Sequence, residues 1–273
     1  MYSQLLSSQN PGLIVILLDQ SASMSDIYEG TTSKSVFAAY AVNKVIGQII
    51  YICTNGAEVR DRCVICVLTY CEEDAKVVLV KKVSDLSKMV VNVVERRERY
   101  IDSSGVQQET IEKIREFVTP KASGGTPMEK AFLKASEIVE EFIKGHPNSF
   151  PPILINVTDG YPNIPDMARE KALKLLSLKT TDGNLLMMNV HIPEKDSTYL
   201  GRIELPNSDK DFETITSAKF LFGISSILPD QMAAKATQED LHCKPGSKAF
   251  IFNADPKSLV RMLNFGSLVA FNR

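Results

Sequence analysis

The feature that most constrains this chain is an alternation between short apolar runs and longer stretches with helical spacing. The apolar runs have the length of strands and occur at 13–18, 63–69, 77–80, 153–158, 185–192 and 249–253. Helical patterns lie between them, at 35–53, 107–118, 127–144, 166–179 and 256–265. Several apolar runs are nearly continuous, which is typical of strands covered on both faces. The pattern predicts an α/β domain with a doubly wound, mostly parallel sheet.

Local signals refine this sheet and its helices. The linker YCEEDAK between the runs 63–69 and 77–80 is too short for a crossover helix. We therefore expect these runs to form a hairpin that gives the sheet one antiparallel edge strand. Asp255 followed by Pro256 predicts a helix start, and Pro165 predicts another.

Two segments do not fit a minimal alternating plan. Residues 84–118 contain the charged stretch ERRERYIDSSG between apolar clusters, for which we predict two helices with a solvated joint. Residues 193–248 separate the last two strands by more chain than a crossover needs, and long loops of this kind are uncommon unless they are functional or mobile. We treat 1–273 as a single domain with a long insertion at about 193–248.

Composition excludes several classes of partner. Thirty-one Lys and Arg against 33 Asp and Glu give a formal charge of −2 with no charged tail, so we expect neither nucleic acid nor a membrane as partner. The first residues lack the features of a signal peptide, and no stretch approaches the roughly 20 apolar residues of a membrane span. Five cysteines, an odd number, indicate reduced thiols, and we expect a cytoplasmic protein.

The cysteines at 63 and 66 form a CxxC pair that could be a redox or zinc motif. They lie within a predicted buried strand, where a spacing of three points the side chains to opposite faces. The pattern therefore favours two core residues over a shared site.

Three polar segments follow or precede predicted elements at one edge of the sheet. They are DQSAS after the first strand, SGGTP before a helix and TDG after the strand at 153–158. Ligands bind to doubly wound sheets at the carboxyl ends of the strands, so these segments should converge there. Their side chains offer only oxygen donors, which suit Mg²⁺, Mn²⁺ or Ca²⁺ better than zinc. The candidate metal ligands are Asp19, Ser21, Ser23, Thr126 and Asp159.

Together these residues resemble the metal-ion-dependent adhesion site of von Willebrand factor A (vWA) domains. The five positions match in order, with Ala22 where the family often has Gly, and the resemblance covers roughly 11–192 and 249–272. It implies that Ser21 and Ser23 ligate the metal directly and that Asp19 and Asp159 act mainly through bound waters. Thr126 would bind the metal directly or through water. Neutral hydroxyls leave the cation electrophilic, so the site should accept a carboxylate from a partner protein.

Each motif also has an ordinary structural interpretation. Asp19 and Ser21 could be turn or cap residues, and Asp159 with Gly160 could form a plain turn. Thr126 begins TPME, in which its hydroxyl could cap the following helix.

The sequence gives little support for catalysis. Haloacid-dehalogenase-type enzymes have a second Asp where this chain has Ser21, GxSxG is absent around the serines, and SGGTP lacks the lysine of a phosphate-binding loop. We expect a protein that is not an enzyme.

The layout is similar to bacterial stand-alone vWA proteins of the tellurium-resistance and stress-associated group. That resemblance implies a scaffold or regulator in phosphorylation signalling, with a Ser/Thr kinase or a phosphatase as partner. The alternatives are an extracellular adhesin-like module and a metal-dependent phosphoesterase. Many vWA domains switch by sliding their last helix, which here corresponds to Pro256–Leu268, although Leu259, Met262, Leu263 and Phe265 should pack on the sheet.

Overall fold

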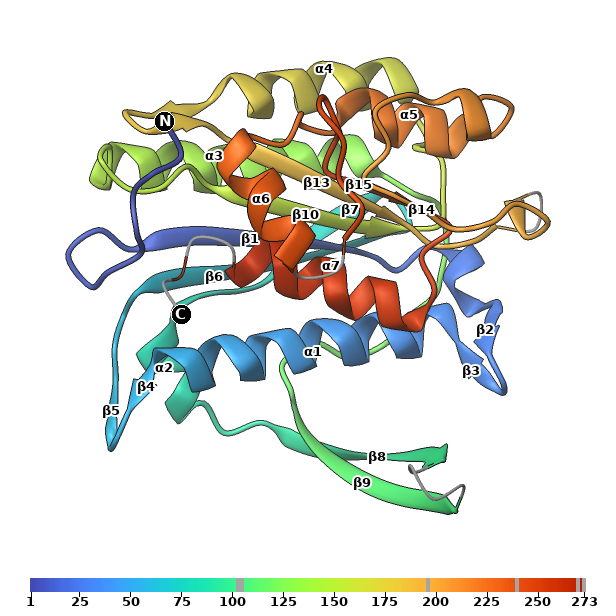
Figure 1. Cartoon of the computed structure of the whole chain (residues 1–273), viewed down its shortest axis with the longest axis horizontal. Helices are drawn as coiled ribbons and strands as arrows, with labels where there is room; N and C mark the ends of the chain where they lie inside the picture. The colour runs from blue at the N-terminus through green and yellow to red at the C-terminus, as the bar shows by residue number, and fades with distance from the viewer. Residues whose placement is uncertain (102–105, 195–196, 239–240, 269–270, 272–273) are drawn as a thin grey trace.

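A seven-stranded sheet forms the centre of the computed structural model, which describes residues 1–101, 106–194, 197–238, 241–268 and 271. The strand order is β14-β15-β13-β10-β1-β6-β7 (Figure 1). The strands are β1 (Gly12–Asp19), β6 (Cys63–Cys71), β7 (Asp74–Lys82), β10 (Ile153–Thr158), β13 (Leu186–His191), β14 (Ile203–Glu204) and β15 (Phe250–Phe252). Five of them run parallel, and β7 pairs antiparallel with β6 at one edge. The predicted α/β sheet with an antiparallel edge strand is confirmed, and the two-residue β14 adds an antiparallel pairing at the opposite edge.

Helices cover both faces of the sheet, in the Rossmann-like arrangement that the resemblance to vWA domains implies (Figure 1). One face carries α1 (Lys34–Cys53) and α7 (Pro256–Leu268), and the other carries α3 (Met128–Gly145), α4 (Pro165–Ser177) and α5 (Thr216–Ile224). The central strand β1 is buried along its whole length because it contributes side chains to two hydrophobic cores, one on each face of the sheet. Its side chains alternate between them, with Ile14, Ile16 and Leu18 in one and Leu13, Val15 and Leu17 in the other.

The helix-start signals hold where they were predicted. The Asp255 carboxylate accepts a hydrogen bond from the backbone N–H of Ser258 at 2.7 Å, and α7 begins at Pro256. Pro165 occupies the first turn of α4. The four apolar residues of α7 expected to face the sheet are buried: Leu259, Met262, Leu263 and Phe265.

Helix α1 is long and apolar enough to cross a membrane by length and composition alone. In the fold, 61% of its most apolar window is buried, and it packs against α7 and against the sheet. These contacts are those of a core helix.

The prediction of two helices over 84–118 is wrong. A short helix α2 (Val83–Lys88) is followed by an antiparallel ribbon of β8 (Asn92–Ile101) and β9 (Gln107–Glu116). Residues 102–105 of the predicted joint lie outside the described part of the chain. Ile111 and Ile114, whose spacing of three indicated a helix, lie on opposite faces of β9, 52% and 6% exposed. Cross-strand pairing of β-branched and charged residues outweighs the helical spacing here.

The insertion at 193–248 is structured where it is described. It contains β14, a short 3-10 helix η3 (Lys210–Phe212), α5 and α6 (Asp230–Gln238), and α5 packs against β13 and β15. Three two-stranded ribbons complete the fold: β2 (Ile27–Glu29) with β3 (Thr32–Ser33), β4 (Thr54–Asn55) with β5 (Glu58–Val59), and β11 (Lys179–Thr180) with β12 (Gly183–Asn184).

The CxxC pair is part of the core. Cys63 packs in the core on the α1 face of the sheet and Cys66 in the core on the other face, as the strand periodicity predicted. The two thiols therefore share no site.

Candidate metal-binding site

The parallel pairing of β1 with β10 brings two of the predicted site residues together. Leu18 lies opposite Val157, so both strands end at the same edge of the sheet. Asp19 ends β1 and Asp159 follows β10, and both side chains are buried. The carboxylates that lie 140 positions apart in the sequence thus meet at the carboxyl end of the sheet, as predicted.

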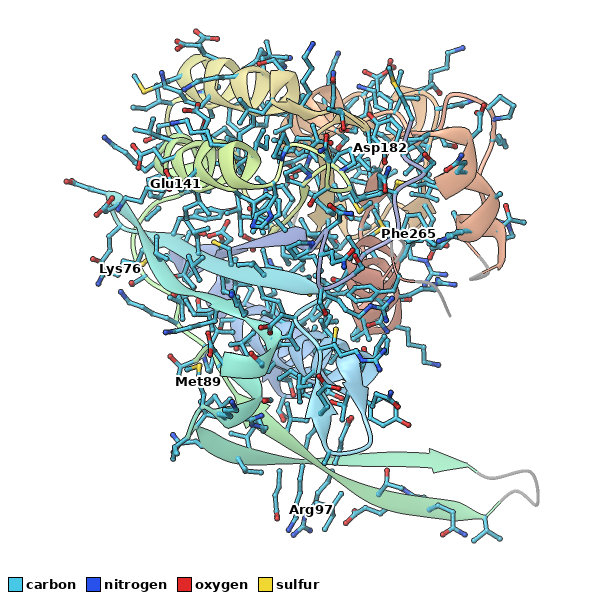
Figure 2. All side chains as sticks on the ribbon, turned by 90° about the vertical axis from the view of Figure 1, so that its left-hand side faces the viewer. Lys76, Met89, Arg97, Glu141, Asp182 and Phe265 are labelled. Atoms are coloured by element: carbon cyan, nitrogen blue, oxygen red, sulfur yellow. The ribbon has the colours of Figure 1, made fainter. Side chains whose placement is uncertain are left out.

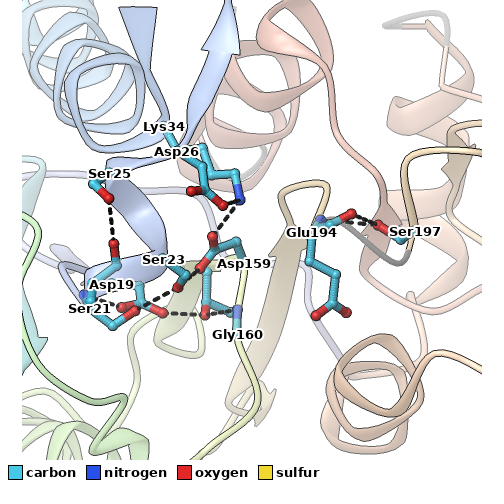
Figure 3. A network of polar contacts seen from close by, with 12 residues as sticks. Asp19, Ser21, Ser23, Ser25, Asp26, Lys34, Asp159, Gly160, Glu194 and Ser197 are labelled. Carbon is cyan, nitrogen blue, oxygen red and sulfur yellow. Dashed lines mark hydrogen bonds and ion pairs between the residues drawn. The ribbon is translucent and has the colours of Figure 1, made fainter.

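The loop after β1 curls its serines toward Asp159. The backbone N–H of Ser21 donates to Oδ1 of Asp19 at 2.7 Å, and a 3-10 helix, η1 (Ala22–Ser25), begins at the next residue. Ser21 precedes this helix, but its side chain caps none of the helix N–H groups. Its hydroxyl lies 3.2 Å from that of Ser23, which donates to Oδ1 of Asp159 at 2.7 Å (Figure 3). A turn at Asp19 is therefore present, yet the hydroxyls of Ser21 and Ser23 contact each other, and that of Ser23 contacts Asp159.

Backbone hydrogen bonds tie the loop that contains Thr126 to the loop after β1. Ser123 donates its N–H to the carbonyl of Gln20 at 2.8 Å, and Ala22 donates to the carbonyl of Gly124 at 2.9 Å. Gly124 has a φ of +66°, and a Cβ there would lie 2.5 Å from Cα of Glu72. Gly124 is thus needed for the close approach of this loop to the β6–β7 turn, and a Cβ on Gly125 would clash with the Asn163 side chain.

Thr126 does not cap the following helix. α3 begins at Met128, and the residue before it is Pro127, which can make no side-chain cap. The backbone of Thr126 is held by Asn163, which accepts from its N–H and donates to its carbonyl, each at 3.0 Å. The capping interpretation of TPME is therefore wrong, and Asn163 is a supporting residue that sequence reasoning missed.

Gly160 keeps open the space between the loops. A Cβ built on it would lie 3.2 Å from Oγ1 of Thr126 and 3.7 Å from Oδ2 of Asp19. Thr126 and Asp19 therefore both approach residue 160 closely, and glycine allows this approach because it has no side chain.

Burial of the carboxylates sets the electrostatics of the site. Burial, and after it the nearby Asp159 carboxylate, raise the pKa of Asp19, which comes to about 7. Hydrogen bonds from Thr158 and Ser21 oppose this shift. Two buried carboxylates so close together are costly unless a positive charge offsets them.

Lys34 supplies one such charge. Its Nζ lies 2.7 Å from Oδ2 of Asp159, and the two side chains are 5% and 0% exposed. Asp26, at 3.5 Å from the same Nζ, is 40% exposed. Nothing near Lys34 in the sequence indicated this contact, because a lysine that precedes an apolar helix is ordinarily solvated.

The donor set fits a hard divalent cation. The four groups that converge directly are two carboxylates and two hydroxyls, and Thr126 adds a third hydroxyl beside Asp19. Within the described ranges, no group of three or more His, Cys, Asp or Glu side chains is placed to hold a metal ion. A cation at this edge would therefore depend on the hydroxyls, and oxygen donors suit Mg²⁺, Mn²⁺ or Ca²⁺.

An open groove of about 520 Å³ lies beside the site. Its lining includes Gln20, Gly124 and Gly125 from the two site loops. Glu72, Asp74 and Lys121 contribute charged groups to the other side. The groove is continuous with the loops that carry the candidate ligands, so a partner segment could occupy both.

A second buried polar cluster lies at the end of β13. Nε2 of His191 lies 3.2 Å from Oγ of Ser217 and 3.5 Å from Oε1 of Glu194, and Ser217 also donates to Glu194. Both partners meet the same ring nitrogen, whereas a catalytic triad places its acid on the other one. Ser217 and His191 are buried as well, so this geometry is that of a structural network.

No family model matches the chain, and no curated protein matches it. Several solved structures do. The vWF domain of the type V pili tip protein Mfa5 from Porphyromonas gingivalis is 13% identical with a TM-score of 0.35, covering 56% of this chain and 38% of that chain. Proximal thread matrix protein 1 from the mussel byssus is 14% identical with a TM-score of 0.39, covering 67% and 38%. The manganese-loaded Plasmodium vivax TRAP protein is 12% identical with a TM-score of 0.40, covering 94% and 73%. The chain thus spans less than half the length of the first two structures.

Proposed function

We propose that this chain is a vWA-type protein-interaction module that depends on a divalent cation and has no catalytic role. One observation carries the proposal: the hydroxyls of Ser21 and Ser23 lie 3.2 Å apart beside two buried carboxylates. The Ser21 side chain makes no capping hydrogen bond to η1, and Ser23 uses its hydroxyl proton on Asp159, so each hydroxyl oxygen keeps a lone pair for a cation. Mg²⁺ is the proposed cation, with Mn²⁺ or Ca²⁺ as alternatives.

The proposed roles follow from the position of each side chain. Ser21 and Ser23 would bind the cation directly, and Asp19 and Asp159 would act mainly through waters while fixing the loops. Thr126, held in place by Asn163, would complete the set directly or through water. A cation held by neutral hydroxyls keeps enough positive charge to bind a carboxylate from a partner.

We infer that the partner is a protein with an exposed acidic residue. The groove of about 520 Å³ would receive the residues that flank this acid. Recovery of partners from a lysate, with and without EDTA, separates metal-dependent partners from the rest. Because α5 packs on the sheet, exposed residues of the insertion are replaced instead of deleting it: Tyr199→Ala and Ile227→Ala test whether the insertion selects the partner.

For the cellular role, we propose a scaffold or regulator in a bacterial stress or tellurium-resistance response, with a Ser/Thr kinase or a phosphatase as partner. A cytoplasmic location is proposed because all five cysteines are free thiols in the structure. The competing proposal is an extracellular adhesin-like module. Thiol titration combined with cell fractionation distinguishes them, since a cytosolic protein with five reactive thiols after unfolding would exclude the adhesin.

A metal-dependent phosphoesterase is the remaining alternative. It requires turnover of a generic phosphate ester that survives purification and is lost in Asp19→Ala. We expect no such turnover.

Calorimetric titration of Mg²⁺ tests the proposed site. The wild type and the double variant Ser21→Ala with Ser23→Ala are compared, in the presence of a blocked peptide with one glutamate. Ser25→Ala is a matched control, because its hydroxyl lies in the same 3-10 helix but bonds to the carbonyl of Ala22. We expect the wild type and the control to bind and the double variant to lose binding. Equal binding by all three, or by none, would contradict the proposal.

A further inference from the structure

Lys34 is the one cationic side chain in contact with the candidate ligands among the described residues. Asp159 is shared between it and the site: Oδ1 accepts from Ser23, and Oδ2 lies 2.7 Å from Nζ of Lys34 (Figure 3). The lysine therefore binds one oxygen of the Asp159 carboxylate while Ser23 binds the other.

The position of Lys34 is unfavourable for a lysine on two counts. It is the first residue of α1, where Ser33 is the N-cap, and a positive charge is disfavoured at the positive end of a helix dipole. It is also buried, and a buried ammonium group is costly without a partner. A local choice that violates two physical preferences is expected where function requires it.

The ribbon of β2 and β3 fixes the lysine in this position. This ribbon joins the site loop to α1. The backbone N–H of Lys34 donates to the carbonyl of Asp26 at 2.9 Å, which closes the ribbon, and the Asp26 carboxylate lies 3.5 Å from Nζ. Asp26 thus contacts Lys34 at both ends, through the backbone N–H and through the ammonium group.

We propose that Lys34 makes metal binding depend on the acidic partner; this inference rests on the proposed metal site. The lysine neutralises one of the two buried carboxylates, Asp19 and Asp159. Among these buried groups, a divalent cation added to the remaining negative charge leaves one excess positive charge, which Asp26 offsets only in part because its carboxylate is 40% exposed. The cation alone is therefore held weakly, and a partner carboxylate that removes the excess charge strengthens its binding. By linkage, the cation strengthens the binding of the partner to the same extent.

Mn²⁺ titrations by calorimetry on four proteins test this inference. They are the wild type, Lys34→Gln, Lys34→Arg and Lys44→Met. The glutamine keeps a hydrogen-bond donor for Asp159 but removes the charge, and the arginine keeps the charge. Lys44 is a control on the same helix, where it pairs with Glu112 at 2.9 Å, away from the site. Each protein is titrated alone and with a blocked peptide that contains one glutamate, and a glutamine peptide serves as its control.

We expect Lys34→Gln to bind Mn²⁺ alone roughly tenfold more tightly than the wild type, within the usual range of such couplings. The glutamate peptide should then strengthen Mn²⁺ binding much less in Lys34→Gln than in the wild type. Lys34→Arg and Lys44→Met should behave as the wild type. If Lys34→Gln is not folded without metal, as judged by circular dichroism, its folding is followed by circular dichroism as Mn²⁺ is added, because the metal binds only the folded site.

The possible failures are distinguishable. If the wild type binds Mn²⁺ and Lys34→Gln binds it equally or more weakly, the role of Lys34 is overturned and the proposed metal site stands. If no protein binds Mn²⁺ with or without the glutamate peptide, both proposals are overturned.

Discussion

The site loops and the β8–β9 ribbon both bring charged side chains together, but they do so in opposite environments. In the site, Ser23 meets Asp159 across 136 positions of sequence, and the carboxylate is buried. In the ribbon, Glu95 meets Lys113 across two neighbouring strands at 3.3 Å, and both side chains are more than half exposed. The ribbon projects from the body of the molecule, with Arg97 on its outer part (Figure 2).

This difference determines what each contact contributes. An exposed ion pair replaces contacts with water at little net gain. A buried carboxylate has lost its water, so removal of its one cationic partner leaves a large uncompensated cost. Substitutions should therefore lower the free energy of unfolding strongly in the site and weakly in the ribbon. The following variants test that ranking.

Lys34→Met should have the largest effect on stability. It leaves Asp159 buried beside Asp19 without a positive charge, which should lower the free energy of unfolding by about 3 kcal/mol in the absence of metal. Urea denaturation measures the change. Saturating Mn²⁺ should restore part of the loss, because it binds only the folded site. A loss no larger than that of Lys44→Met would show that the buried pair of Lys34 and Asp159 contributes no more to stability than the pair of Lys44 and Glu112.

Gly124→Ala should have the next largest effect, about 2 kcal/mol, because it combines a positive φ with a clash against the backbone of Glu72. Gly56→Ala is the matched control, since Gly56 has a φ of +61° with nothing within 4 Å of the new Cβ. The control should lose only about 1 kcal/mol. Equal losses in thermal or urea unfolding would mean that the contact between Gly124 and the backbone of Glu72 is not tightly packed.

Arg96→Ala tests the side of the ribbon that packs against α1, where Arg96 contacts buried aromatic rings. The guanidinium lies over the rings of Phe37 and Tyr40, 4.3 and 4.2 Å from their centroids. Its loss should lower the free energy of unfolding by about 1 kcal/mol. Arg96→Lys should recover part of this if the charge over the rings is responsible, whereas no difference between Lys and Ala would exclude it.

Arg97→Ala should have the smallest effect. Its pair with Glu109 spans 3.6 Å, and the arginine side chain is 70% exposed. The change in unfolding free energy should stay within about 0.5 kcal/mol and shrink further at high salt. A loss comparable to that of Lys34→Met would overturn the ranking of the two regions.

The parts of the fold that the sequence predicted are those specified by local pattern. The continuous apolar run of β1 and the helical spacing of α3 each determine their element within one short window. The position of Ser21 and Ser23 at this edge of the sheet could be predicted because they directly follow β1 and parallel strands end at one edge, whereas their role as metal ligands stays a prediction. The hairpin of β6 and β7 could be predicted because its linker is too short for any other connection.

The parts that could not be predicted depend on distant contacts. The spacing of Ile111 and Ile114 matches a helix, and only pairing with β8 makes this segment a strand. Lys34 and Asp159 lie 125 positions apart, so nothing near the lysine signals its burial. Asn163 likewise acquires its role only when its loop meets Thr126.

The most direct test of the metal site is an anomalous-scattering map from a crystal grown with Mn²⁺. We expect one peak within about 2.5 Å of the hydroxyl oxygens of both Ser21 and Ser23, with Asp19 and Asp159 around it. A map with no peak between these serines at saturating Mn²⁺, or with the metal bound elsewhere, would contradict the proposed metal site.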